Sequence, residues 1–362
     1  MPNDSALASL GWDDEWQARF APYTHDDLVP ARVVAEHRSQ YLVAAEDGER
    51  PAVVAGRLRH DAHLDDDPAD ARPTVGDWVA LSTSGDGAGV IRAVLRRRTA
   101  FVRRAPGRAE RPQVVAANVD IVGVVAPLSA PLNARWLERF VAVAWDSGAT
   151  PLVVLTKVDL CDDPARALAD ARVSAPGVDV VAVSALAGTG LDALSAQLPP
   201  RRTLVLLGAS GAGKSTLVNA LVGGARMATG AVRADGKGRH TTSHRELVPL
   251  ANGALLVDTP GMRELGLWGT DGGVETTFAD VEALGTSCRF ADCAHGREPG
   301  CAVRAAVEAG ALDAERLAAW HKLRRELAHL ARKTDASAAA DAKAQIRAVM
   351  RGVRRMYRER GR

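Results

Sequence analysis

Short apolar segments alternate with polar turns between Arg32 and Leu95, which predicts five β-strands without intervening helices. Asp47-Gly48, between the second and third segments, is a typical hairpin signal. A small barrel of the OB type fits this pattern, and a barrel that serves only as a packing module is the alternative. The predicted strands are Arg32–Ala35, Tyr41–Ala45, Ala52–Gly56, Val75–Leu81 and Val90–Leu95.

From Asn118 onward the pattern changes to alternating buried strands and amphipathic helices, which predicts a parallel α/β domain of about 150 residues. The predicted helices are Asn133–Asp146, Pro164–Val173, Leu191–Leu198 and Lys214–Leu221. The predicted strands are Asp120–Ala126, Pro151–Leu155, Asp179–Val183, Thr203–Leu207, Glu246–Leu250 and Ala254–Val257. Farther on, a helix is predicted over Leu312–Lys333, whose His321 and His329 suit a solvated or RNA-facing surface better than a metal.

Length and composition indicate the number of domains and the cellular location. The chain has 362 residues, 47% of them hydrophobic, which predicts two or three domains. It contains neither an apolar run of the ~20 residues that span a bilayer nor a signal-like N-terminus, so we expect a soluble cytoplasmic protein without a membrane partner. Residues 1–25 are expected to form a polar leader that packs weakly through its tryptophans.

The formal net charge is only +2, so the distribution of charge matters more than the total. Arginines gather at Arg96–Arg104, around Phe101, and again at Arg351–Arg362. Basic side chains next to an aromatic ring are typical of barrels that bind nucleic acid, while a solvated charged face is the other interpretation of the first cluster. The C-terminal cluster is interpreted as an arm that binds phosphates.

The residues Gly208–Thr216 match the phosphate-loop pattern GxxxxGK[ST] between a predicted strand and a predicted helix. Glycine lets successive backbone N–H groups turn toward phosphate oxygens at the positive end of the helix dipole. Lys214 is expected to reach the β- and γ-phosphates, and the Ser215 hydroxyl to ligate Mg²⁺. The predicted loop comprises Gly208, Ala209, Ser210, Gly211, Ala212, Gly213, Lys214, Ser215 and Thr216.

Three further motifs follow predicted strands, where ligands bind in such folds. Thr156, Lys157, Val158 and Asp159 resemble the base-reading [NT]KxD motif of GTPases, in which the aspartate accepts hydrogen bonds that guanine offers and adenine does not. Ser184 and Ala185 resemble the backbone element that contacts guanine O6. The sequence from Asp258 to Gly261 matches DxxG, in which the aspartate holds Mg²⁺ through water and the glycine N–H contacts the γ-phosphate.

The order of these motifs is permuted. Ordinary GTPases have the phosphate loop first, then DxxG and [NT]KxD, whereas here [NT]KxD and Ser-Ala come first. Strand ends that meet in space can be visited in any chain order, so the permuted order is compatible with an intact site. It also means that the segment after Asp258 leads directly into the C-terminal domain, and we expect nucleotide state to be transmitted there.

A segment rich in glycine and arginine, Gly223–Arg245, is predicted to contain the threonine that ligates Mg²⁺ in the triphosphate state. Thr242 is the preferred candidate and Thr241 the alternative. Met262 follows DxxG where a water-orienting glutamine is usual, so His240 is predicted to position the attacking water. A contact to phosphate or RNA is the other interpretation of His240.

Three of the four cysteines lie close together, at Cys288, Cys293 and Cys301, with His295 between them. Three thiolates and one imidazole suit a closed, structural Cys₃His zinc site. A disulfide or unrelated free thiols are the alternatives, and Cys161 is interpreted as an ordinary thiol.

Together these residues resemble the small ribosomal subunit biogenesis GTPases of the RsgA family. The similarity rests on the permuted order, the phosphate loop, Gly238–Thr242 and the cysteine spacing, and covers residues 28–330. Thr156 replaces a common asparagine, and Ser243 replaces a third switch threonine. The implied fold class is α/β: a circularly permuted P-loop GTPase domain between an OB-type barrel and a mainly helical zinc-binding domain. The expected ranges are 1–27 for the leader, 28–108 for the barrel, 112–268 for the GTPase domain, 269–333 for the zinc domain and 334–362 for the tail.

The resemblance implies GTP hydrolysis to GDP stimulated by the small (30S) ribosomal subunit, in late maturation of that subunit. It also implies contact with 16S rRNA through barrel and zinc domain, a catalytic role for His240 supported by Lys214 and Thr242, one Zn²⁺, and Mg²⁺ with GTP. We expect a monomer. A P-loop ATPase or kinase, and an RNA-binding module that holds GTP only as a structural ligand, remain alternatives.

Overall fold

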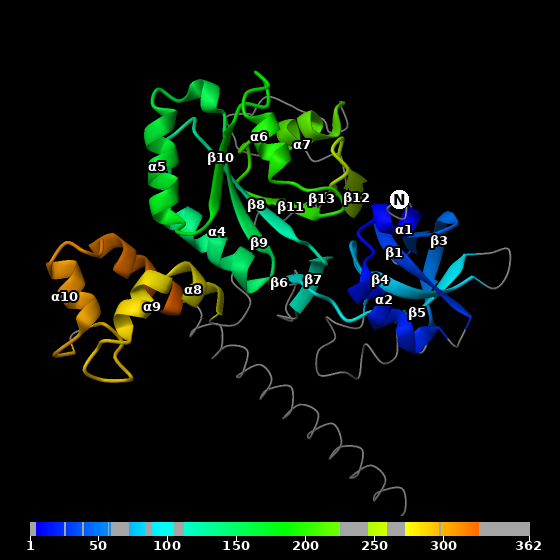
Figure 1. Cartoon of the computed structure of the whole chain (residues 1–362), viewed down its shortest axis with the longest axis horizontal. Coiled ribbons are helices and arrows are strands. Elements are labelled where there is room, and N and C mark those ends of the chain that lie inside the picture. Colours follow the sequence, from blue (N-terminus) through cyan, green and yellow to red (C-terminus); the bar gives the residue numbers. More distant parts are fainter. Residues whose placement is uncertain are drawn as a thin grey trace, which may run out of the picture. The chain divides into compact units, whose positions relative to one another are not determined.

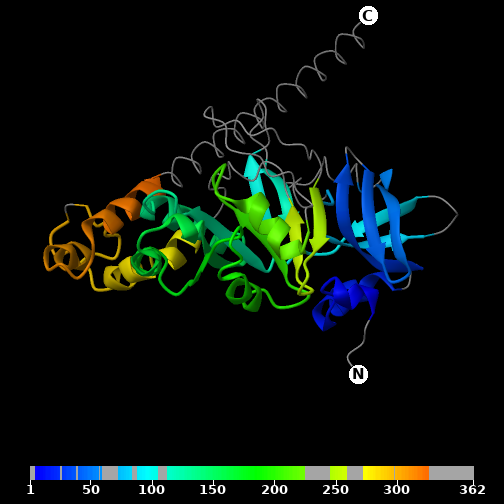
Figure 2. The same cartoon turned by 90° about the horizontal axis from the view of Figure 1, so that it is seen from above.

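A computed structural model describes residues 5–24, 27–37, 40–56, 58, 72–83, 88–104, 112–224, 245–258, 272–296 and 298–325. The chain forms two compact units (Figures 1 and 2). The described residues up to 258, together with 272–279, belong to the first unit, and those from 280 onward belong to the second. No helix among the described residues is both long and apolar enough to cross a membrane.

The N-terminal barrel contains the five predicted strands. β1 (Leu28–His37) pairs with both β2 (Gln40–Ala45) and β4 (Trp78–Ser82), and β3 (Gly48–Val54) pairs with β2 and with β5 (Gly89–Val94). A β4–β5 ladder closes the ring. The core is filled from alternate strand positions, among them Val33, Val43, Val79, Leu81 and Ile91, each fully buried.

The N-terminal segment packs tightly, so the prediction of a weakly packed leader is wrong. It forms α1 (Ala6–Ser9), α2 (Asp14–Phe20) and the 3₁₀ turn η1 (Ala21–Tyr23). Trp16 and Phe20 are 2% and 3% exposed and join Trp78 and Leu95 in a core cluster. The sequence signal was present in Ser5 and Asp13, whose side chains cap the two helices.

The α/β part of the first unit has a parallel sheet in the order β10-β9-β8-β11-β13. Its strands are β8 (Ile121–Pro127), β9 (Thr150–Thr156), β10 (Asp179–Val183), β11 (Thr203–Leu207) and β13 (Leu255–Asp258). Figure 1 shows α4 (Ala134–Asp146) and α5 (Pro164–Ser174) on one side of the sheet, and α6 (Leu191–Ala196) and α7 (Lys214–Val222) on the other. The predicted parallel α/β architecture is confirmed for these strands.

One strand departs from the parallel pattern. β12 (Arg245–Pro249) runs antiparallel to β13 and, on its other edge, antiparallel to β1 of the barrel. The two ladders join barrel and α/β sheet into one 11-stranded sheet. The periodicity of an apolar strand does not encode its direction, so the sequence did not reveal this junction.

Arg97 and Arg98 of the arginine cluster after the barrel are engaged within the protein and Phe101 is buried, so the interpretation that places Phe101 beside basic side chains at a nucleic-acid surface is wrong. Phe101 lies on β6 (Ala100–Arg104), which forms a hairpin with β7 (Pro112–Ala117), and its side chain is 1% exposed and cannot stack on a base. Arg97 forms two hydrogen bonds with buried Asp77, at 2.7 and 2.8 Å. Arg98 pairs with Asp13 and stacks on the ring of Trp16.

The second unit is helical in its described part. It contains most of α9 (Ala279–Gly285), α10 (Ala302–Glu308) and a helix over 314–325. Arg316 donates two hydrogen bonds to Asp280, at 2.6 and 2.8 Å, which ties the helix over 314–325 to α9. The preceding helix α8 (Gly272–Thr277) belongs to the first unit, where it packs against α4.

Candidate nucleotide site and metal centre

The phosphate-loop sequence forms a tight turn from β11 into α7. Gly211 and Gly213 have φ of +76° and +91°, values that residues with a Cβ rarely adopt. A Cβ at Gly208 would lie 2.5 Å from the carbonyl oxygen of Val125 on β8. The Lys214 ammonium donates to the carbonyl oxygens of Gly208 and Ala209, at 2.6 and 2.8 Å, so this side chain folds over the loop.

The [NT]KxD motif is bonded directly to this loop. The Thr156 hydroxyl, at the end of β9, donates a 2.6 Å hydrogen bond to the carbonyl oxygen of Ala212, and both residues are buried. Lys157 follows with φ +60°, and Asp159 lies exposed in the 3₁₀ turn η2 (Val158–Leu160). The threonine that replaces asparagine therefore connects the predicted base-binding segment to the predicted phosphate-binding loop.

Ser184 begins a short loop after β10. Its N–H donates to the carbonyl oxygen of Thr189 and its hydroxyl accepts from the N–H of Ala187, which closes the loop on itself. Ser184 is 1% exposed, and the half-buried Ala185 packs against the core of the sheet.

Asp258 is the last residue of β13 and is half-buried. Because β9, β10, β11 and β13 are parallel, the segments that follow them emerge at the same edge of the sheet. The structure thus brings Thr156–Asp159, Ser184–Ala185, Gly208–Thr216 and Asp258 to one edge. Gly261, His240 and Thr242 lie outside the described residues.

The Cys₃His cluster is assembled in the second unit. The ligand atoms of Cys288, Cys293, His295 and Cys301 all lie within 4.8 Å of one another. His295 Nδ1 lies 3.6 Å from Sγ of both Cys288 and Cys301, which are themselves 3.9 Å apart. Four converging donors of this type can hold one metal ion.

Neighbouring residues fix the imidazole of His295. Its ring lies 5.1 Å from the ring of Trp320, whose indole N–H donates to Glu282 at 2.8 Å. Gly285 leaves room for the far side of the ring, because a Cβ there would lie 3.2 Å from Nε2. Burial lowers the pKa of His295, which favours the neutral imidazole that can ligate a metal.

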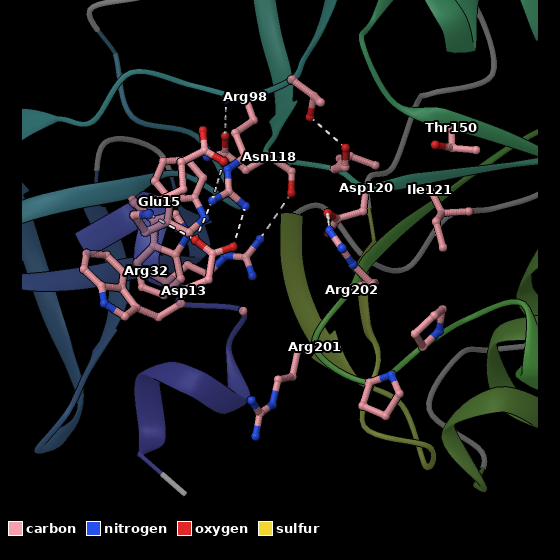
Figure 3. A pocket seen from close by; sticks show the side chains of 18 of the residues that line it. Asp13, Glu15, Arg32, Arg98, Asn118, Asp120, Ile121, Thr150, Arg201 and Arg202 are labelled. Atoms are coloured by element: carbon pink, nitrogen blue, oxygen red, sulfur yellow. Dashed lines mark hydrogen bonds and ion pairs between the residues drawn. The ribbon is translucent and has the colours of Figure 1, made fainter. Parts of the chain in front are cut away.

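A junction at the opposite edge of the sheet was missed by sequence reasoning. A cavity of about 760 Å³ is lined by residues of the N-terminal helices and by residues at the amino ends of the strands (Figure 3). Arg32, which lines it, is 2% exposed and donates to backbone carbonyls of Leu10, Gly76 and Asn118 and to the hydroxyl of Thr203.

The guanidinium of Arg32 has no carboxylate within ion-pair distance among the described residues, and burial lowers its pKa to about 10. The sequence offers no signal that Arg32 is buried at this junction, since an arginine within a strand pattern is normally interpreted as solvent-facing.

Fold and site together define a circularly permuted GTPase with an N-terminal barrel and a C-terminal Cys₃His cluster. The family model described as RsgA GTPase matches residues 94–268. The chain is 47% identical to the small ribosomal subunit biogenesis GTPase RsgA of Opitutus terrae, covering 98% of this chain and 99% of the relative. It is also 47% identical to the protein of the same name from Streptomyces coelicolor, covering 99% and 94%.

Comparison with solved structures supports the same fold. The crystal structure of YjeQ from Thermotoga maritima superposes with a TM-score of 0.62 at 27% identity, covering 83% of this chain and 98% of that one. YloQ, described as a circularly permuted GTPase, gives a TM-score of 0.60 at 24% identity, which supports the fold alone. The chain belongs to the RsgA GTPase family and is a GTP-hydrolysing enzyme. The similarity extends beyond residues 28–330, so the range expected from the motifs was too narrow.

Proposed function

We propose that this GTPase acts in late biogenesis of the small ribosomal subunit, which stimulates its hydrolysis of GTP to GDP and phosphate. The observation that carries the proposal is the gathering of three motifs, and of Asp258 from the fourth, at one sheet edge in a chain whose relatives are named for that process. We assign base recognition to Thr156–Asp159 with Ser184 and Ala185, and phosphate binding to Gly208–Thr216 with Gly261. His240 is assigned the positioning of the attacking water, with Lys214 and Thr242 supporting catalysis.

Two metals belong to this proposal. Ser215, Thr242 and Asp258 would hold Mg²⁺, which would neutralise charge on the β- and γ-phosphates. The Cys₃His cluster would hold structural Zn²⁺. Zinc distances of about 2.3 Å to sulfur and 2.0–2.1 Å to nitrogen, at tetrahedral angles, separate ligand atoms by roughly 3.5–3.8 Å. The separations of 3.6 and 3.9 Å among Cys288, His295 and Cys301 support that assignment, and the ligand atom of Cys293 lies within 4.8 Å of the other three.

The proposed partners are GTP and GDP, the 30S particle and its 16S rRNA, and a factor that acts on this particle works in the cytoplasm. We assign the rRNA contact to surfaces of the barrel, the second unit and the tail other than Arg97 and Arg98, which are engaged internally. The protein is proposed to act as a monomer.

Phosphate release from GTP and ATP, each with and without purified small subunits, tests the function. GTP-specific release that rises strongly with subunits is expected, and His240→Ala should reduce the stimulated rate. Asp159→Asn serves as the matched specificity variant and should favour xanthosine triphosphate over GTP. ATP turnover, or GTP turnover indifferent to subunits, would contradict the proposal.

A further inference from the structure

Strand β12 links the barrel to the strand that ends in Asp258. On one edge it pairs with β1, Ala35 opposite Glu246 and Glu36 opposite Arg245. On its other edge Glu246 stands opposite Asp258, at the start of a four-residue ladder with β13. A single residue of β12 therefore separates the barrel strand from Asp258.

An ion pair reinforces the short β1–β12 ladder. Glu36 Oε2 lies 2.9 Å from Arg245 Nη1, and the two side chains are only 26% and 14% exposed. The same oxygen accepts a 3.4 Å hydrogen bond from the hydroxyl of buried Thr74. Opposite charges that face each other across two strands stabilise their register, and partial burial limits screening by salt.

The register of β12 matters because a slip by one residue would exchange its two faces. Val248 of β12 is 2% exposed and belongs to the core of the α/β sheet. Only two residue pairs join β1 and β12, so the side-chain pair contributes to holding these two strands in register.

We infer that Glu36 and Arg245 are positioning residues for the Mg²⁺ site: they hold β12 against the barrel and thereby fix the place of Asp258. This inference rests on the proposed role of Asp258 in holding Mg²⁺. Asp258 is proposed to act on Mg²⁺ through a coordinated water, and the near-ideal octahedral geometry of the ion fixes where that water lies. A displaced carboxylate loses its hydrogen bond to this water, which weakens Mg²⁺ binding. The base-binding and phosphate-binding segments follow other strands, so loss of the pair affects Mg²⁺ binding and leaves metal-free nucleotide binding unchanged.

The test uses the full chain with Glu36→Gln and Arg245→Gln. The Mg²⁺ concentration for half-maximal GTP hydrolysis is expected to rise about three- to tenfold, in the range known for residues that act through a neighbouring element. GDP affinity measured in EDTA is expected to stay at the wild-type value. Arg245→Lys keeps the charge and should fall between wild type and Arg245→Gln.

Three comparisons make the outcome decisive. Asp13→Asn breaks an ion pair with Arg98 elsewhere in the same unit and should leave the Mg²⁺ requirement unchanged. Glu36→Gln and Arg245→Gln proteins that melt earlier but need no more Mg²⁺ than wild type would show a purely structural pair and overturn the inference. Asp258→Asn distinguishes failure of the proposed Mg²⁺ role of Asp258 from failure of the positioning role of the pair. An unchanged Mg²⁺ requirement in Asp258→Asn would overturn the role of Asp258 and the inference with it. A raised requirement there, with none in the pair variants, would overturn the inference alone.

Discussion

Thr156→Val removes the hydroxyl that joins the predicted base-binding segment to the phosphate loop while keeping the shape of the side chain. Thr156 is 3% exposed and its acceptor, the carbonyl of Ala212, belongs to a residue that is 1% exposed. The substitution opens no cavity, so its cost comes from the lost 2.6 Å hydrogen bond and the unpaired carbonyl. A group left unsatisfied in this way costs about 1–3 kcal/mol.

Because the bond lies within the proposed nucleotide site, we expect part of this cost to appear in the affinity for GDP. A loss of about 1–2 kcal/mol corresponds to GDP affinity roughly 5- to 30-fold weaker. Fluorescent-GDP titration measures the affinity and urea unfolding the stability. Thr156→Asn keeps a donor in the position where asparagine is common in this motif, and should stay closer to wild type in both measurements.

Thr203→Val is the matched control. Thr203 is equally buried, and its hydroxyl accepts a 2.8 Å hydrogen bond from Arg32 at the opposite end of the sheet. We expect a comparable loss of stability with GDP affinity unchanged. A Thr156→Val protein that is less stable but binds GDP like wild type would refute the reasoning, since the bond would then serve folding alone.

Three further changes have defined outcomes. Gly208→Ala places a methyl group 2.5 Å from a backbone carbonyl of β8 and should weaken GDP binding at least ~100-fold, measured by the same titration. Gly285→Ala places a methyl group 3.2 Å from His295 Nε2, and a chelator should remove the proposed Zn²⁺ from this variant about three- to tenfold faster than from wild type. Burial raises the pKa of Asp13, but hydrogen bonds from Arg98 and backbone outweigh it and hold that pKa below 3.8. The Asp13–Arg98 pair therefore contributes stability above about pH 4, and this contribution is lost as the pH falls through the folded-state pKa of Asp13. In melting experiments at different pH, Asp13→Asn should show a smaller fall of the melting temperature at low pH than wild type.

The elements that form the sheet edge with the proposed nucleotide site could be predicted because each carries its own local signal. An apolar run followed by glycines and a lysine specifies a strand, a turn and a helix at Thr203–Leu207 and beyond, without reference to the rest of the chain. The asparagine cap and apolar spacing of α4 specify that helix in the same way, and Asn133 does accept from the N–H of Trp136. The Cys₃His cluster was equally visible, because its spacing is local.

What could not be predicted depends on partners distant in sequence. The direction of β12 is set by its ladders with β1 and β13, and the burial of Phe101 by a hairpin whose second strand begins at Pro112. The arginines at 97 and 98 looked like a free basic surface because Asp77 and Asp13, their partners, lie 20 and 85 residues away along the chain. Composition gives the number of charged side chains but does not show which of them are paired in the fold.

The buried guanidinium of Arg32 has a consequence for the order in which the protein is assembled. Its acceptors come from four segments: Leu10 before α2, Gly76 before β4, Asn118 after β7 and Thr203 on β11. A folding intermediate that buries Arg32 without any one of these segments leaves a cation with unsatisfied donors, which is unfavourable. An intermediate that instead keeps Arg32 hydrated cannot close the packing around it. Partly assembled states are therefore penalised, and the N-terminal helices, the barrel and the GTPase sheet are expected to fold and unfold as one cooperative body. A nascent chain cannot complete this arrangement until Thr203 has left the ribosome, long after the barrel sequence has emerged.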